Sequence, residues 1–516
     1  MYFRIVRAKG AKGRSHEYIR LVESYRDKGK NKQRTVANLG RKDLLLPHLD
    51  SLNRLLRGDG RPSDAVRIGD VKAVHAWDWG PVLVARHLWR ELGLEQILDQ
   101  LAPRRGRQTA PLADRVFALV ANRLCRPGSE HRLARWLEHT FVCDRRGQPW
   151  QPQWRHEAER RASRAPRVRV QFRQLQHWYR TLDQLGPLKQ EIERELFHRL
   201  RDLFSLKVDL VFYDLTSTYF EGHGPPRLGA HGYSRDGKGR RRQVLLGCVM
   251  VDGWPIAHHV FAGNWRDSTT VPSVLADLEQ RFGLGRIVFV GDRGMVTSDN
   301  LALLRQRAQG YIVGLQRRRR EDVYRYIEQA RGAWIRCPVG VTAREQREPP
   351  QTVVQEVASD TPGVRIFVVH SDDRLEYERG QRLKAMARVR ERLEALQERV
   401  STGRLKAADK VGAAAARALT DNHGYRYYDW AYANGQFRFF EHPVTLKREE
   451  AYEGKYVIQT EEQNVSAVDA VTIYKQLSDV ERAFANLKDV IEMRPIFHHS
   501  DERVQAHIFI AALAFV

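Results

Sequence analysis

The sequence predicts a mixed α/β fold, because strand-like and helix-like segments alternate over residues 208–314. The predicted strands are short apolar runs, rich in Val, Leu, Ile and Phe, at residues 208–213, 243–251, 256–261, 286–290 and 311–314. Asp252 and Gly253 form a turn signal, so the second and third strands should pair as a hairpin. Helices are expected at residues 271–282 and 299–309. Three strands, then helix, strand, helix and strand, is the order expected of a mixed sheet.

The part of the chain after this sheet has a different character. It contains a long predicted helix at residues 375–400 and aromatic segments at 425–430 and 437–440. The last helix that the α/β domain needs comes only at residues 468–489, after a strand at 455–459. We therefore predict an α/β domain formed by residues 206–315 and 455–516, with residues 316–454 inserted before its last helix.

Two basic regions come before the α/β domain. Residues 1–60 form a basic N-terminal hairpin region, with predicted strands at 18–25 and 33–39. Either the charges protect a solvated strand edge or they contact DNA, and the pattern leaves both open. Residues 61–205 carry apolar residues at helical spacing between Arg-rich loops. This predicts a helical, DNA-binding domain, although helical periodicity alone does not identify a helix-turn-helix motif.

The composition favours a polyanionic partner. Among 516 residues, 87 are Lys or Arg and 63 are Asp or Glu, which gives a formal charge of +24 and a pI near 10.1. Nucleic acid is the first candidate and an anionic membrane the second. No apolar stretch reaches the roughly 20 residues that span a bilayer. The four cysteines are scattered, which is typical of a reducing cytoplasm, and we expect no membrane association.

Three acidic residues are candidates for a metal site. Asp214 and Asp292 each follow an apolar strand, and Glu481 lies on the late helix. Singly, an Asp after a strand is more often a turn former or a helix cap, and a helical Glu is more often a solvated charge. Together they offer the oxygen ligands that magnesium prefers. Two such ions, about 3.5 to 4 Å apart, activate water and stabilise the leaving oxygen of a phosphodiester.

Three motifs carry a resemblance to a known family. They are residues 213–219, residues 290–295, and the set Tyr474, Leu477, Glu481 and Lys488, whose members are separated by two, three and six residues. With them the chain resembles the DDE transposases of the IS4 superfamily, most closely the IS1634-type group. The third motif is similar to the superfamily signature of Tyr, Arg, Glu and Lys. Leu477 stands where that signature has arginine.

The resemblance implies a fold and a set of site residues. It implies a ribonuclease H-like catalytic core in which Asp214, Asp292 and Glu481 hold two Mg²⁺ ions, with Mn²⁺ as a substitute. It also implies that Tyr474 and Lys488 contact DNA near the cleaved phosphate. Without the family, Tyr474 would be a core aromatic and Lys488 a solvated charge. The basic residues from which we expect further DNA contacts are Arg293, Arg317 and Arg318.

The function implied is that of a transposase acting on double-stranded DNA. The enzyme would cut at the terminal inverted repeats of an insertion sequence, free a 3′ hydroxyl and transfer it into target DNA. A homodimer would pair the two ends, in the bacterial cytoplasm and at the nucleoid. No nucleotide cofactor is expected, and the sequence has no phosphate-cradling Gly-Lys-Ser/Thr loop.

Two other functions remain open. One is a ribonuclease H-like nuclease without strand transfer. The other is a truncated or domesticated transposase that only binds DNA, because the chain ends in an apolar run, 508–516, where family members usually continue. The adjacent histidine pairs at 258–259 and 498–499 lack the spacing of a rolling-circle nuclease, and we expect these side chains to be exposed or to face DNA.

Overall fold

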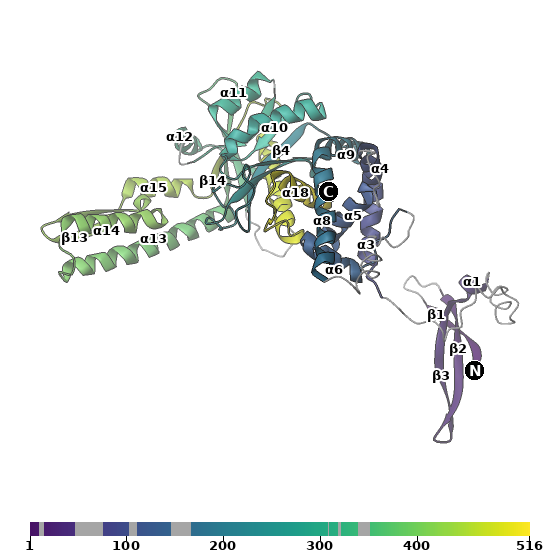
Figure 1. The fold of residues 1–516 in the computed structure, drawn as a ribbon. Coiled ribbons are helices and arrows are strands. Elements are labelled where there is room, and N and C mark those ends of the chain that lie inside the picture. Colours follow the sequence, from purple (N-terminus) through teal and green to yellow (C-terminus); the bar gives the residue numbers. More distant parts are fainter. Residues whose placement is uncertain are drawn as a thin grey trace. The chain divides into compact units, whose positions relative to one another are not determined.

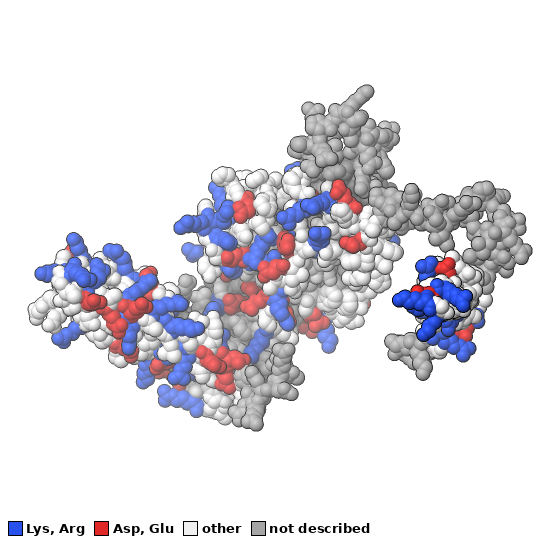
Figure 2. Space-filling model, turned by 90° about the horizontal axis from the view of Figure 1, so that it is seen from below, with Lys and Arg blue, Asp and Glu red and all other residues white. Residues whose placement is uncertain are grey.

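The structure, a computed structural model, divides the chain into two compact units, Met1–Ala76 and Trp77–Val516 (Figure 1). The residues that it describes are 1–9, 15–46, 76–102, 111–145, 167–307, 309–317, 321–338 and 351–516. Figure 2 shows Lys and Arg side chains close together on the strands of the first unit. On the face of the second unit seen there, they are interspersed with Asp and Glu.

The first unit is a three-stranded antiparallel sheet in the order β1-β2-β3. Its strands are β1 (Tyr2–Lys9), β2 (Ser15–Asp27) and β3 (Lys30–Arg41), followed by the short helix α1 (Lys42–Leu45). Lys28 and Gly29 turn β2 into β3 with φ of 48° and 77°, a left-handed conformation that suits a tight hairpin. The sequence pattern predicts only two strands here, and β1 adds a third along the other edge of β2.

The second unit begins with a helical region. Its helices are α3 (Gly80–Glu91), α4 (Leu94–Leu101), α5 (Leu112–Cys125), α6 (Glu130–His139), α8 (Arg167–Leu185) and α9 (Lys189–Phe204). Apolar residues recur on one side of each helix, so large side chains such as Trp89, Phe117 and Trp178 are buried between them. None of the helices that the structure describes is long and apolar enough to cross a membrane.

The centre of the second unit is a nine-stranded mixed sheet in the order β6-β5-β4-β7-β8-β14-β11-β10-β9. Its first part contains β4 (Leu210–Tyr219), β5 (Gln243–Val251), β6 (Trp254–Ala262), β7 (Val288–Gly291) and β8 (Gly310–Gly314). The rest contains β9 (Ile335–Cys337), β10 (Thr352–Val357), β11 (Arg365–Ser371) and β14 (Lys455–Thr460). Strands β4, β7 and β8 are parallel to one another, and the remaining pairs are antiparallel.

This sheet changes the predicted boundary of the insertion. Residues 316–454 are not wholly separate from the α/β domain, because β9, β10 and β11 lie within that range and extend the same sheet. Pairing between strands far apart along the chain is not encoded in a local sequence pattern. Helix α12 (Glu321–Gln329) and helix α15 (Pro443–Tyr452) pack together beside this part of the sheet.

A smaller part of the predicted insertion has a core of its own. It is formed by α13 (Asp372–Ser401), α14 (Ala408–Thr420), the short turn η5 (Asp421–Arg426), β12 (Tyr428–Ala433) and β13 (Gln436–Glu441). Figure 1 shows α13, α14 and β13 as an arm that extends from the sheet. Since α13 begins directly after β11, the first turn of this long helix stays at the sheet.

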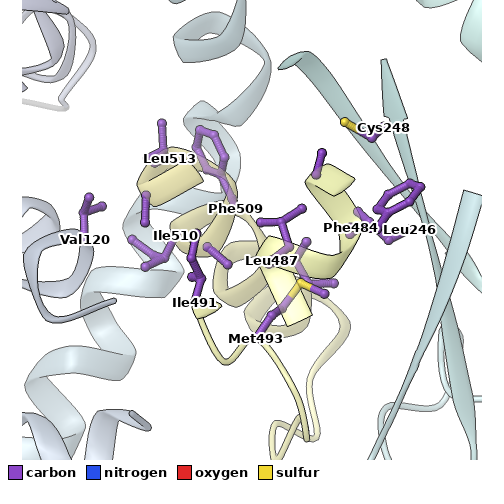
Figure 3. Packing of buried hydrophobic residues seen from close by; sticks show 14 of the residues in the cluster. Val120, Leu246, Cys248, Phe484, Leu487, Ile491, Met493, Phe509, Ile510 and Leu513 are labelled. Carbon is purple, nitrogen blue, oxygen red and sulfur yellow. The ribbon is translucent and has the colours of Figure 1, made fainter. Parts of the chain in front are cut away.

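Helices cover both faces of the first part of the sheet. On one face, α10 (Asp267–Phe282) and α11 (Ser298–Gln306) bury the alternate β4 residues Val211, Tyr213 and Leu215. The other face is covered by α16 (Ala467–Lys475), α17 (Leu477–Ala485), the π turn η6 (Asn486–Val490) and α18 (Asp501–Phe515). Figure 3 shows Phe484 beside Leu246 of β5, within the cluster that also contains Phe509 of α18.

Candidate active site

The register of two parallel strands brings Asp214 and Asp292 together. β4 and β7 pair as far as Tyr213 opposite Gly291, so the two aspartates are the next residues on neighbouring strands. The sequence pattern predicts that Asp214 ends its strand, but the strand is longer. β4 continues to Tyr219 by pairing with β5 alone. The functional edge is therefore the point where β4 loses its parallel partner.

Asp292 is the first residue beyond β7 and precedes the short 3₁₀ turn η4 (Arg293–Met295). Its side chain makes no capping hydrogen bond to that turn, so the carboxylate is not used as a helix cap. Instead, the Tyr474 hydroxyl donates a hydrogen bond to Asp292 Oδ1 at 3.3 Å. A Cβ atom at Gly314, at the end of β8, would lie 2.2 Å from the Tyr474 oxygen, so this approach requires glycine.

Glu481 comes from α17, whose apolar side packs on the sheet. Leu477, Val480 and Phe484 are buried, which leaves Glu481 exposed on the side of the helix that faces the acids. Among the residues that the structure describes, no cation pairs with Glu481. The sequence pattern predicts one helix over residues 468–489, and the structure divides it at Gln476 into α16 and α17.

One open cleft contains all three acids. Its walls come from the ends of β7 and β8, the first turn of α13, β14, and helices α16 and α17. The charged and polar residues lining it are Asp214, Asp292, Arg293, Arg317, Ser371, Asp373, Arg374, Tyr377, Glu378, Tyr456, Tyr474, Lys475, Ser478 and Glu481. Elements far apart in the sequence thus bring the three predicted acids to a single surface.

The electrostatics of the cleft disfavour further negative charge. Burial raises the pKa of Asp214 to about 7, and the neighbouring Asp292 and Glu481 raise it too, against the opposing effects of the Leu215 N–H and Arg235. The pKa of Glu481 is also raised, first by loss of water and then by Asp292. A cation entering the cleft would relieve both effects, so the donor set and its charge fit a divalent metal.

The ligand atoms of the three acids do not form one compact group. Ligand atoms of all three do not lie within 4.8 Å of one another, the separation found among the described residues only for Glu130, His498 and His507. Oxygen ligands of one magnesium ion lie about 2.1 Å from it, so one ion cannot contact all three acids as they stand.

Lys488, the last residue of the signature, is engaged inside the protein. Its ammonium donates to Asp236 Oδ1 at 2.9 Å, and its side chain is only 9% exposed. Burial lowers the pKa of Lys488, whereas its hydrogen bond to Asp236 opposes this shift. Arg494 contacts the same carboxylate oxygen at 2.5 Å. Asp236 lies between Arg235 and Gly237, in a loop that the sequence pattern did not connect with Lys488.

The arginines predicted to contact DNA differ in their surroundings. Arg293 is exposed on the cleft wall and, within the described structure, its guanidinium has no acidic partner. Arg317 lines the same cleft but is only 7% exposed, and it donates to Glu378 and to the Tyr452 and Lys455 carbonyls. This favours a structural role for Arg317, contrary to the sequence-based expectation. Arg318 lies outside the described residues.

Sequence reasoning missed several residues of the cleft. Arg374 and Lys475 line the cleft, but no sequence motif identified either of them as a candidate site residue. The hydroxyl residues 216–218 are buried in β4. The Ser217 hydroxyl accepts a hydrogen bond from the Arg235 N–H at 2.8 Å, which fastens the loop carrying Asp236 to the strand.

Of the histidine pairs predicted to be exposed or to face DNA, only His499 is exposed. His258 and His498 are buried, His259 is half-buried and His499 is exposed. His258 packs on Phe509, and its Nδ1 lies 2.7 Å from Glu193. Strand β6 is covered on both faces. The alternation of residue types along a single strand does not reveal that both faces are covered.

A second cluster joins the helical region to the C-terminal segment. His507 Nδ1 lies 3.0 Å from Glu130 Oε1, and His498 Nε2 lies 3.5 Å from the other oxygen of Glu130. Although these three residues could hold a metal, Arg123 lies 3.3 Å from His507 Nδ1 and 3.8 Å from Glu130. A buried guanidinium so close favours a hydrogen-bonded ion cluster over a metal site.

Comparisons with known proteins place the chain. Residues 3–65 match the IS1634 family transposase N-terminal domain, and residues 209–516 match the transposase DDE domain. No curated protein matches the chain. A solved structure of piggyBac transposase in a synaptic complex with hairpin DNA is 8% identical, with a TM-score of 0.32, and the match covers 86% of this chain and 75% of that one. That likeness is too distant to carry an argument. Since the DDE match spans more than half of the sequence, the chain belongs to the DDE transposases, and its N-terminal match makes it one of the IS1634 type.

Proposed function

We propose that this transposase cuts double-stranded DNA at the ends of an insertion sequence and transfers the freed 3′ hydroxyls into target DNA. The observation that carries the proposal is the cleft in which Asp214, Asp292 and Glu481 meet and, among the residues that the structure describes, form no ion pair with a cationic side chain. In a DDE transposase domain, such a set of acids is suited to hold two Mg²⁺ or Mn²⁺ ions.

Each acid has a distinct support in the protein. Asp214 is held by the sheet, Asp292 is oriented by the Tyr474 hydroxyl, and Glu481 approaches from α17. Bound metal would supply Lewis-acid activation of the attacking oxygen and neutralise the charge on the leaving oxygen. The exposed Arg293 would hold a phosphate of the DNA beside the acids, and Lys488 would do so after exchanging Asp236 for phosphate. A homodimer would pair the two ends, at the nucleoid of a bacterial cell.

The experiment that tests this uses the purified chain and duplexes from both flanks of the gene that encodes it. Cleavage should require Mg²⁺ or Mn²⁺ and stop when EDTA is added. Pre-cut ends incubated with a plasmid should give joined products. Replacing any one acid, as in D214N, D292N or E481Q, should lower both reactions by at least about a thousandfold, because metal ions supply several kcal/mol of transition-state stabilisation.

The matched control is D479N, which removes another carboxylate from α17. Asp479 pairs with Arg482 on the surface and does not line the cleft, so this variant should react like the parent. Cleavage without joined products would favour a nuclease without strand transfer. Binding without cleavage by the parent protein would favour a transposase that only binds DNA.

A further inference from the structure

The acid cleft also carries positive charge. Among the residues that the structure describes, four basic ones line the cleft, namely Arg293, Arg317, Arg374 and Lys475. A DNA strand that reaches three carboxylates must bring phosphates past them, and those phosphates need cationic partners. Which of these residues can serve depends on what already binds each cationic group.

Two of the four are occupied. Arg317 donates to Glu378 and to two backbone carbonyls in the interior, as described above. The Lys475 ammonium donates to the Thr352 hydroxyl at 2.9 Å, and burial lowers the pKa of Lys475. Arg293, on η4, is exposed but has no side-chain contact that would fix its direction among the described residues.

Arg374 differs from the other three, because it is fixed in direction and still able to bind. It lies in the first turn of α13, and its Nε donates to Glu378 Oε1 at 2.9 Å one turn later. Its guanidinium carbon lies 5.1 Å from the centre of the Tyr456 ring. Among the described residues, its two terminal nitrogens make no hydrogen bond, and its side chain is 34% exposed. A guanidinium held at one edge and on one face presents a preorganised fork.

The support under Arg374 continues to the acids. The Tyr456 ring stacks on the Tyr474 ring, with centroids 5.8 Å apart and planes inclined by 29°. The Tyr474 hydroxyl in turn donates to Asp292. Two stacked aromatic rings and one hydrogen bond therefore connect the guanidinium to Asp292 and support its position relative to that acid.

The described lining residues that come from α17 include no cation. Leu477, which stands where the family signature has arginine, lines the same cleft and is 9% exposed. It can contribute apolar contact but no charge. Within the described lining of the cleft, a fixed and available guanidinium comes from the α13 side instead.

We propose that Arg374 binds a non-bridging phosphate oxygen of the DNA strand in the acid cleft, so that α13 contributes directly to substrate positioning. This inference rests on the proposed function, since it needs DNA in that cleft. It places one substrate contact in the region that the sequence pattern treats as an insertion. Glu378 and Tyr456 then act as positioning residues for Arg374.

The test combines R374A with neutral phosphates in the DNA. Duplexes from the flanks of the encoding gene are prepared with one phosphate at a time replaced by methylphosphonate. In the parent protein, one position near the cleaved bond should weaken binding and cleavage by about tenfold. In R374A, the same methylphosphonate replacement should not weaken binding or cleavage any further. The slope of log K against log salt concentration should also fall by about 1.

Two further variants separate contact from support. R379A removes an exposed arginine from the next turn of α13, away from the cleft, and should retain the full methylphosphonate effect. R374K keeps a charge that can pair with Glu378 but loses the fork, so its cleavage should lie between R374A and the parent. Thermal unfolding of each variant shows whether the fold is retained, and R374K gives the answer if R374A does not fold.

The outcomes separate the inference from the proposed function. One outcome is that the parent cleaves and that methylphosphonate at the same position still weakens binding and cleavage by R374A about tenfold. In that case Arg374 does not contact that phosphate and the inference is wrong. Cleavage by R374A equal to that by R379A would also overturn it while leaving the proposed function intact. If the parent neither binds nor cleaves these duplexes, both fail together.

Discussion

Two groups of acids inside this protein have opposite electrostatic surroundings. In the cleft, burial and mutual repulsion raise the pKa of Asp214 and that of Glu481. In the packed interior, burial would raise the pKa of Glu130 and that of Glu193, but neighbouring His, Lys and Arg side chains hold both well below the usual range. The interior acids are neutralised by the chain itself. Among the residues that the structure describes, the cleft acids have no such ion-pair partner, which is what distinguishes a candidate metal site from a structural ion cluster.

The largest effect on stability should come from removing an interior acid. Glu193 pairs with Lys189 at 2.9 Å, with His258 at 2.7 Å and with Arg281. E193Q would leave buried cations without their counter-charge and should lower the free energy of unfolding by about 3–5 kcal/mol. Urea unfolding measures this. E195Q, on the exposed side of the same helix, should change it by less than about 0.5 kcal/mol.

The same cluster should make the protein sensitive to acid. Burial lowers the pKa of His258 and that of His259 to about 4, with Lys189 and Arg281 acting in the same direction and Glu193 and Asp277 opposing it. The folded protein therefore keeps both rings neutral, and their contribution to stability is present above pH 6.5 and lost as the pH falls toward 4. When the pH falls from about 8 to about 5, each of the two histidines should lower the free energy of unfolding by about 2 kcal/mol.

The check is urea unfolding of the parent and of H258Q/H259Q at both pH values. The double variant should lose less stability on acidification than the parent does. An equal loss in the two proteins would mean that other groups dominate the acid response.

Removing an acid from the cleft should have the opposite sign. Because ionised Asp214 is disfavoured in the fold, D214N should raise the free energy of unfolding without metal by about 2 kcal/mol at neutral or higher pH. Mg²⁺ should stabilise the parent and stabilise D214N less. Thermal unfolding with and without Mg²⁺ measures both, with D479N as the surface control. A loss of stability in D214N comparable to that in E193Q would remove the distinction between the two groups of acids.

Much of the cleft could be predicted from sequence, because its acids lie in recognisable local patterns. Asp214 and Asp292 follow apolar strands, and Glu481 stands at the spacing of a family signature. Parallel strands then bring the first two together without further information. By contrast, Arg374 follows a strand whose place in the sheet is decided by pairing with β14, far along the chain. No local pattern distinguishes it from the other arginines of α13.

Lys488 shows the same limit of prediction from local sequence. The signature predicts its functional importance, but its partner Asp236 is 252 residues away. Only the folded structure shows that the lysine is buried and paired. In the same way, the burial of His258 depends on α9 and α18, which cover β6 and leave no mark on the sequence of that strand.

The smallest of these stability effects should come from Asp236, which stands between the two groups. Its side chain is 6% exposed and contacts Lys488 and Arg494, of which Arg494 is 25% exposed and can be solvated when the acid is lost. D236N should therefore cost about 1–2 kcal/mol, less than a fully buried pair. D489N removes the surface partner of the same Arg494 and should cost less than about 0.5 kcal/mol. If D236N lowers cleavage far more than D489N does, at an equal fraction of folded protein, Asp236 holds Lys488 and Arg494 in place for the DNA. Equal cleavage by the two variants would mean that Asp236 has a purely structural role, as Glu193 does.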